Sequence, residues 1–205
     1  MMRALFFLAA VFSVTTADAG DLTTQMARCA FCHGADGIAG NPIWPSLAGQ
    51  DAGYLKRRML SYRAGDNTSQ NAQQMRFVLN ALSDADIASI AKYYAALDPA
   101  KPAGGAAAPG AAIYHAGIEG RSGSCASCHG ARGEGNADLL APRLAGQSAH
   151  YMVKQLAAYA DGTRPHRDSG MAETALALSV DERQAVSRYL QSMAPTFPVE
   201  SKDEE

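Results

Sequence analysis

The chain lacks an excess of positive charge, since it carries 18 Lys and Arg residues against 20 Asp and Glu residues. Binding to nucleic acid requires clustered cations that neutralise phosphates, so this balance argues against that class of function. The sequence also lacks the alternation of apolar and polar residues that is typical of strands. Beyond its N-terminus it has no apolar run near the roughly 20 residues that a membrane-spanning helix needs. These absences predict a helical chain without a nucleic-acid or transmembrane role.

The N-terminus alone is strongly apolar, and it has the three parts of a secretory signal. Arg3 supplies a positive charge, residues 4–14 form an apolar run, and small residues lead to Ala19. The run is too short for a membrane span. We predict a signal peptide over residues 1–19, cleavage after Ala19 and export, with a retained N-terminal anchor as the alternative.

Cysteine is absent outside two copies of Cys-x-x-Cys-His, at residues 29–33 and 125–129. Two thiols at positions i and i+3 lie on one face of a helical turn, where both can form thioethers with the vinyl groups on one edge of a porphyrin. The histidine that follows then projects toward the iron, as in covalent haem attachment. The sequence therefore predicts two covalently bound haem c groups. Their predicted attachment residues are Cys29, Cys32, Cys125 and Cys128, and their predicted axial histidines are His33 and His129.

Three other uses of these cysteines are open. Zinc ribbons pair Cys-x-x-Cys units about 15–20 residues apart, whereas these motifs start at residues 29 and 125. A single zinc ion recruited through the fold would give neither histidine a reason to follow its cysteines directly. A redox dithiol expects a βαβ context, which the sequence does not show. Two disulfides would suit an exported protein, but haem vinyl groups are better partners for cysteines that precede a histidine.

The chain is an internal duplication. Residues 45–50, Pro-Ser-Leu-Ala-Gly-Gln, match residues 142–147, Pro-Arg-Leu-Ala-Gly-Gln. Further matched pairs are Tyr54 with Tyr151, Tyr62 with Tyr159, and Leu82-Ser83 with Leu178-Ser179. A long unit that occurs only twice indicates two homologous domains rather than a solenoid. We predict domain 1 over residues 20–98, a linker rich in Pro, Gly and Ala over 99–110, domain 2 over 111–198 and an acidic tail over 199–205.

Each unit carries helical patterns. Apolar residues recur at i, i+4 and i+7 in both repeats, as Leu55, Met59 and Tyr62 and as Met152, Leu156 and Tyr159. Capping-box patterns open the last helix of each unit, at Ser83 with Asp86 and at Ser179 with Glu182. The apolar stripes behind these caps are Ile87, Ile90, Ala91 and Tyr94, and Val186, Tyr189, Leu190 and Met193. The fold class is therefore predicted to be all-α, with two related domains that each wrap around one haem.

The second axial ligand decides whether each haem iron is open to substrate. Met75 and Met171 stand the same number of residues after His33 and His129, in segments that read as polar loops (66–74 and 163–170). A thioether is a soft ligand that raises the reduction potential, so we predict that both methionines bind iron. Core packing is the alternative for a methionine. The rival ligands His115, His150 and His166 have no histidine at the equivalent place in the first repeat.

Three further features of the sequence each have two possible roles. The carbonyls of Pro45 and Pro142 are candidate acceptors for the ring proton of the axial histidines, with a plain turn as the alternative. Trp44 has no aromatic counterpart, since Ala141 stands at the equivalent position of the other repeat, and it is expected to pack in the core or to donate to a haem propionate. A basic cluster, defined as Lys56, Arg57, Arg58 and Arg63, is either a solvated helix face or a surface that guides an acidic partner.

On these residues the chain resembles the dihaem cytochrome c4 family, whose members have two class I cytochrome c domains in tandem. The resemblance rests on the two Cys-x-x-Cys-His motifs, the repeated Pro-x-Leu-Ala-Gly-Gln and the methionines ahead of Leu-Ser helix starts. It implies the axial pairs His33 with Met75 and His129 with Met171, a periplasmic location, and haem propionates that face one another across the domain interface. It also implies electron delivery from a membrane quinol-oxidising complex to a terminal oxidase, by a carrier that associates with the membrane at most peripherally.

Two classes of function follow. With six-coordinate irons the protein is an electron carrier of a respiratory chain and not an enzyme. The alternative is the cytochrome subunit of a sulfur-oxidising flavoprotein or a haem peroxidase-like enzyme, which would need an open iron or an added catalytic site. The paired methionines favour the carrier.

Overall fold

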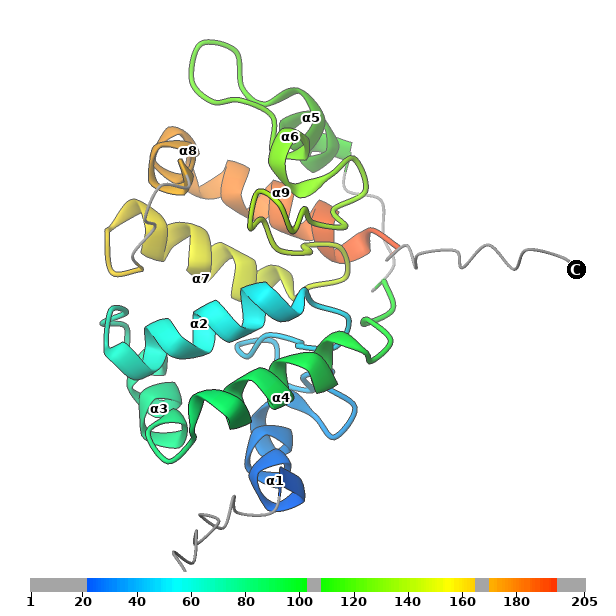
Figure 1. Cartoon of the computed structure of the whole chain (residues 1–205). Coiled ribbons are helices and arrows are strands. Elements are labelled where there is room, and N and C mark those ends of the chain that lie inside the picture. The colour runs from blue at the N-terminus through cyan, green and yellow to red at the C-terminus, as the bar shows by residue number, and fades with distance from the viewer. Residues whose placement is uncertain (1–21, 103–107, 165–169, 195–205) are drawn as a thin grey trace, which may run out of the picture.

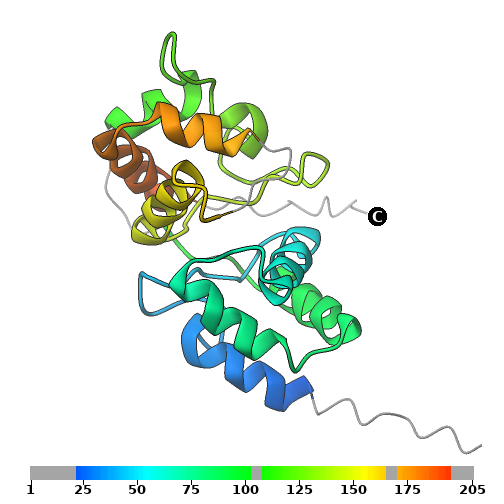
Figure 2. The same ribbon diagram turned by 90° about the vertical axis from the view of Figure 1, so that its left-hand side faces the viewer.

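The computed structural model describes residues 22–102, 108–164 and 170–194, so the predicted signal peptide, the acidic tail and His166 lie outside the described residues. These ranges fold into two stacked groups of helices (Figures 1 and 2). The first group is α1 (Leu22–His33), α2 (Ala52–Ala64), α3 (Gln70–Leu79) and α4 (Asp84–Ala95). The second group is α5 (Ala108–Ala116), α6 (Ala126–His129), α7 (Ala149–Ala160), α8 (Met171–Ala177) and α9 (Val180–Ser192).

The all-α prediction is confirmed. In the described ranges, strand-like pairing is limited to two isolated bridges, between Ile118 and Ser122 and between Asn136 and Ala141. Among the helices that the structure describes, none has the length and apolar character to cross a membrane.

The duplication is visible in the packing and in the hydrogen bonds. Helix α2 packs on α3 and α4, and α7 packs in the same way on α8 and α9. The backbone N–H of Leu47 donates to Gly37 O at 2.7 Å, and the equivalent bond from Leu144 to Gly133 O is 2.8 Å. The repeats differ where the first helix lies: α1 runs into its haem motif without a break, whereas α5 ends at Ala116 and a separate short helix, α6, carries the second motif. Helix α5 begins at Ala108, inside the segment expected to be the linker.

Each repeat has its own apolar core, built from the predicted stripes. In the first, Leu55 and the whole α4 stripe are buried, and Met59 and Tyr62 pack against them. In the second, Met152, Val186 and Leu190 are buried with Tyr114, and Leu156, Tyr189 and Met193 pack around them. The periodicity of the sequence therefore identified the core side of the long helices correctly.

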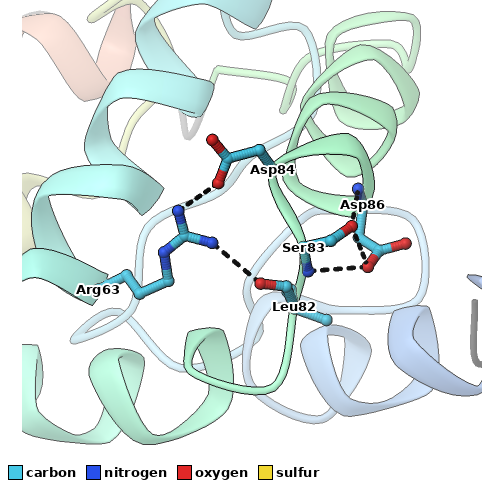
Figure 3. A network of polar contacts seen from close by, with 5 residues as sticks. All are labelled: Arg63, Leu82, Ser83, Asp84 and Asp86. Atoms are coloured by element: carbon cyan, nitrogen blue, oxygen red, sulfur yellow. Dashed lines mark hydrogen bonds and ion pairs between the residues drawn. The ribbon is translucent and has the colours of Figure 1, made fainter. Parts of the chain in front are cut away.

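Both predicted capping boxes are present. The backbone N–H of Asp86 donates to Ser83 Oγ at 3.1 Å, and Asp86 Oδ2 accepts from the Ser83 N–H at 2.9 Å (Figure 3). Arg63 of α2 stabilises the start of α4, because it binds Asp84 and donates to Leu82 O at 2.9 Å. In the second repeat Ser179 and Glu182 form the same box, and Arg121 takes the place of Arg63 by binding Glu182.

One local expectation was wrong. Residues 66–74 read as a polar loop, but α3 begins at Gln70 and Met75 lies inside it. The polar side chains Asn71, Gln73 and Gln74 are on the exposed side of the helix, while Ala72 is buried. Because the buried residue on the described part of the first turn is a small one, Ala72, the helix shows too little apolar periodicity to be recognised from sequence.

The cap of α4 makes the first testable prediction. Ser83→Ala is expected to lower the free energy of unfolding by about 1 kcal/mol, because the first turn loses its side-chain acceptor. Ser69→Ala is the matched control, since Ser69 is the N-cap of α3 but its side chain makes no cap hydrogen bond. Urea unfolding followed by circular dichroism compares the two holoproteins, and equal losses would contradict the prediction.

Candidate functional site

The two motif histidines lie at helix ends and are buried. His33 closes α1 and His129 closes α6, and their exposed fractions are 6% and 7%. His33 Nδ1 lies 2.8 Å from Pro45 O, and His129 Nδ1 lies 2.9 Å from Pro142 O, which confirms the expected carbonyl contacts. A carbonyl oxygen can only accept, so Nδ1 must carry the proton and donate. Each ring therefore keeps the lone pair of Nε2 for a metal.

The protonation of these rings suits metal binding. Burial lowers the pKa of His33 and of His129, and the hydrogen bonds to Pro45 O and Pro142 O oppose this only in part. Both rings are therefore neutral near pH 7, which is the form that ligates iron. The carbonyl also fixes the ring plane and raises the basicity of Nε2.

None of the four cysteines is joined in a disulfide, so all four sulfurs are available for thioethers. Burial raises the pKa of the Cys29 and Cys125 thiols before haem is attached. Helices α1 and α6 lie at opposite ends of the molecule (Figure 1), and in the described ranges no three metal-binding side chains of the His, Cys, Asp and Glu types cluster together. One zinc ion shared by the two cysteine pairs is therefore excluded, while two separate haem attachments fit.

The two candidate methionines lie on equivalent helices. Met75 is on α3, where it packs at the edge of the first core, and Met171 is the first residue of α8. Of the rival ligands, His115 is exposed and its Nε2 lies 2.8 Å from the Tyr189 hydroxyl, while His150 is exposed on α7. His166 is outside the described residues. Ligation by Met75 and Met171 remains a prediction.

A buried arginine lies between the two helical groups, and sequence reasoning missed it. Arg164 is 3% exposed, donates from Nη2 to the Tyr54 hydroxyl at 2.9 Å, and also binds Gln155. Its guanidinium lies 4.5 Å from the ring centroid of Tyr159. It has no counterpart in the first repeat, where Asn67 and Thr68 stand at the matching positions, so no repeat signal marked it.

A second arginine completes this cluster, which we name the arginine–tyrosine cluster: Arg58, Arg164, Tyr54, Tyr62, Tyr151 and Tyr159. The guanidinium carbon of Arg58 lies 4.9 Å from the centroid of the Tyr62 ring. In the part of the chain that the structure describes, Arg58 Nη2 and Arg164 Nε are buried without a hydrogen-bond partner, and neither guanidinium joins an ion pair. Burial alone would raise the pKa of Tyr54, but the charges of Arg164 and Arg58 lower it. Arg164 is buried and Arg58 is half-buried, and a cation removed from water without an anion is costly, so these residues fit the carboxylates of haem propionates.

The docking role of the basic cluster is not supported. Arg57 donates to Leu140 O in the other repeat at 3.2 Å, Arg58 lies in the arginine–tyrosine cluster, and Arg63 binds Asp84. Only Lys56 is exposed and without such a contact. Trp44 is half-buried and belongs to neither apolar core, so the core-packing interpretation of this residue is not supported either.

Comparison with known proteins agrees with this geometry. Residues 17–98 and 107–194 each match the family model for cytochrome c. The chain is 32% identical to cytochrome c4 of Azotobacter vinelandii over 94% of this chain and 100% of that relative. It is 33% identical to the thiosulfate dehydrogenase electron acceptor of Thiomonas intermedia (strain K12) over 95% of this chain and 93% of that relative. The crystal structure of reduced recombinant cytochrome c4 from Pseudomonas stutzeri has a TM-score of 0.75 at 30% identity, covering 85% of this chain and 100% of that one.

Each matched segment contains one Cys-x-x-Cys-His motif with a buried, carbonyl-bonded histidine. The chain therefore carries two covalently attached haem c groups, one in each repeat.

The attachment sites make the second prediction. Replacing Cys125 and Cys128 by alanine is expected to halve the covalent haem content, because thioethers form only with these thiols in the second repeat. Intact mass and haem stain under denaturing conditions measure it. The mirror variant, with Cys29 and Cys32 replaced, should give the same halving, and Ser127→Ala should give none. Retention of both covalent haems in either double variant would refute the assignment.

Proposed function

Because this chain belongs to the cytochrome c family and is a dihaem electron-transfer cytochrome of the cytochrome c4 type, we propose that it shuttles electrons between proteins of a respiratory chain in the periplasm. Its proposed donor is a membrane quinol-oxidising complex and its proposed acceptor is a terminal oxidase. The proposed axial pairs are His33 with Met75 and His129 with Met171. Haem c supplies a reversible one-electron couple whose potential depends on its axial ligands and surroundings.

The observation that carries the proposal is the repeated, buried and carbonyl-bonded histidine. Since Pro45 O and Pro142 O hold both rings in one tautomer and one orientation, the ligands change little between oxidation states. An electron carrier needs this rigidity, because any rearrangement on oxidation or reduction slows transfer. Both histidine side chains are also buried, which limits the access of water to the rings.

The protein supplies charge compensation at the boundary between the repeats. Arg58 and Arg164 are proposed to bind haem propionates, with the tyrosine hydroxyls of the arginine–tyrosine cluster as further donors. This would satisfy Arg58 Nη2 and Arg164 Nε, the two buried atoms that have no partner among the described residues. It would also bring the propionate edges of the two haems toward a common boundary.

A second candidate function is acceptance of electrons from a sulfur-oxidising enzyme. It is supported by the similarity to a relative named as a thiosulfate dehydrogenase electron acceptor, which covers nearly the whole chain. The internal chemistry would be the same, and only the donor would differ. Rapid reduction by a thiosulfate-oxidising enzyme, with no reduction by a quinol-oxidising complex, would favour this candidate.

Axial ligation makes the third prediction. A redox titration followed optically should resolve two reversible one-electron waves, and the reduced protein should not bind carbon monoxide. Met75→Ala and Met171→Ala should each remove about half of the sulfur-to-iron absorption band of the oxidised protein. Each should also lower the reduction potential of one haem, because a thioether ligand raises that potential. Met59→Ala is the control, since Met59 packs in the first core. Immediate carbon monoxide binding by the unaltered protein would overturn the carrier proposal.

The arginine–tyrosine cluster makes the fourth prediction. Arg164→Gln should lower the potential of at least one haem, because a buried positive charge disfavours the oxidised iron and its loss removes that effect. Arg188→Gln makes the same charge change at an exposed position of α9 and should have a smaller effect that disappears at high salt. Equal shifts in the two variants, measured by the same optical titration, would show that Arg164 does not lie beside a haem.

A further inference from the structure

Two glutamines cross the boundary between the repeats, each from the end of its Pro-x-Leu-Ala-Gly-Gln segment. Gln147 Oε1 accepts from the backbone N–H of Ser46 at 3.0 Å, and Gln147 Nε2 donates to Ser46 O at 2.9 Å. Gln50 does the same in the opposite direction, accepting from the N–H of Arg143 at 2.9 Å and donating to Arg143 O at 3.0 Å. The repeats are therefore joined by two equivalent, crossed pairs of hydrogen bonds.

The orientation of both side-chain amides is determined by their partners. Gln147 Oε1 also accepts from the N–H of Ser148 at 2.9 Å, and Gln50 Oε1 from the N–H of Asp51 at 3.0 Å. Each oxygen thus faces two donors while each nitrogen faces a carbonyl, so an exchanged amide would lose all three bonds. Both side chains are buried, with exposed fractions of 7% for Gln50 and 9% for Gln147.

The peptide group that receives each glutamine is the one that holds an axial histidine of the other repeat. In the peptide between Pro45 and Ser46, the oxygen accepts from His33 Nδ1 and the N–H donates to Gln147. In the peptide between Pro142 and Arg143, the oxygen accepts from His129 Nδ1 and the N–H donates to Gln50. One planar, conjugated unit therefore lies between each histidine and the glutamine of the opposite repeat.

We propose that Gln50 and Gln147 are positioning residues that tune the reduction potential of the haem in the opposite repeat, each through one peptide group. An acceptor on the peptide N–H draws negative charge onto the carbonyl oxygen, and hydrogen bonds in series strengthen one another. The stronger carbonyl acceptor makes the histidine ring more basic, which favours the oxidised iron. Each haem therefore has a lower potential when the other repeat is docked against it.

This proposal rests on the axial roles of His33 and His129 proposed above, and it predicts a crossed effect. Gln147→Met removes the acceptor from the Ser46 N–H with little change in side-chain size. It is expected to raise the reduction potential of haem 1, in the first repeat, more than that of haem 2. Gln50→Met is expected to do the opposite. Each potential is assigned to its repeat from the methionine variants: the potential that shifts in Met75→Ala belongs to haem 1, and the one that shifts in Met171→Ala belongs to haem 2.

A purely structural role for the glutamines would give a different result. Ser148→Ala is the control, because Ser148 Oγ donates to Pro42 O across the same boundary at 2.6 Å without touching a histidine-bonded peptide. It removes this contact and the cap that Ser148 Oγ gives the N–H of Tyr151, but it keeps both glutamines, so the potentials should not change. A second readout is the Nδ1–H proton resonance of each histidine in the reduced protein. The His33 resonance should move upfield in Gln147→Met, where its hydrogen bond is weaker, and should not move in Ser148→Ala.

The outcomes separate this proposal from the one on which it rests. Unchanged potentials in both glutamine variants, or equal shifts of both waves that Ser148→Ala reproduces, would overturn the tuning role while leaving electron transfer intact. Should one glutamine variant fail to retain two haems, the mirror variant tests the same prediction in the other direction. Absence of a histidine-ligated haem spectrum in the unaltered protein would instead refute the axial-ligand proposal, and the tuning role with it.

Discussion

The hydrogen bond from each motif histidine to a proline carbonyl is the interaction on which the rest of the structure depends. It selects the tautomer of His33 and His129, aims Nε2 away from the carbonyl, and ties a helix end to the Pro-x-Leu-Ala-Gly-Gln segment. The glycines of that segment, Gly49 and Gly146, have φ values of +67° and +75°, which side chains rarely allow. A Cβ at Gly49 would lie 2.7 Å from Pro99. Glycine thus lets the chain turn so that the next residue, a glutamine, reaches across to the other repeat.

Polar contacts cross the boundary between the repeats. Crossed glutamine–peptide pairs join the two loops, and the arginine–tyrosine cluster lies between the helical groups. Polar contacts of this kind cost more to bury than apolar ones unless every group is satisfied. The glutamines meet this condition within the protein. The arginines do not among the described residues, which is why they point to a group that the haem brings. Under the proposals made above, the same surface supplies both stability and electronic tuning.

Some parts of the site were readable because they are repeated. The Cys-x-x-Cys-His motifs, the matched proline carbonyls and the capping boxes at Ser83 and Ser179 all recur at a constant offset, and each local pattern specifies its own geometry. Arg164 was missed because it occurs once and lies in a polar turn. The four residues of the basic cluster were grouped by charge alone, and the structure gives three of them contacts within the protein. Charge along a helix does not say which side chains meet another part of the chain.

By itself the sequence determined the redox cofactor, the duplication and the helical class, because covalent attachment and helical periodicity depend on residues close together in the chain. Only the tertiary structure decided how the repeats face each other. It paired Gln147 with the peptide that holds His33, Gln50 with the peptide that holds His129, and Arg164 with Tyr54. These contacts join residues about one repeat apart in the sequence, and no local pattern encodes a distance in space between two surfaces.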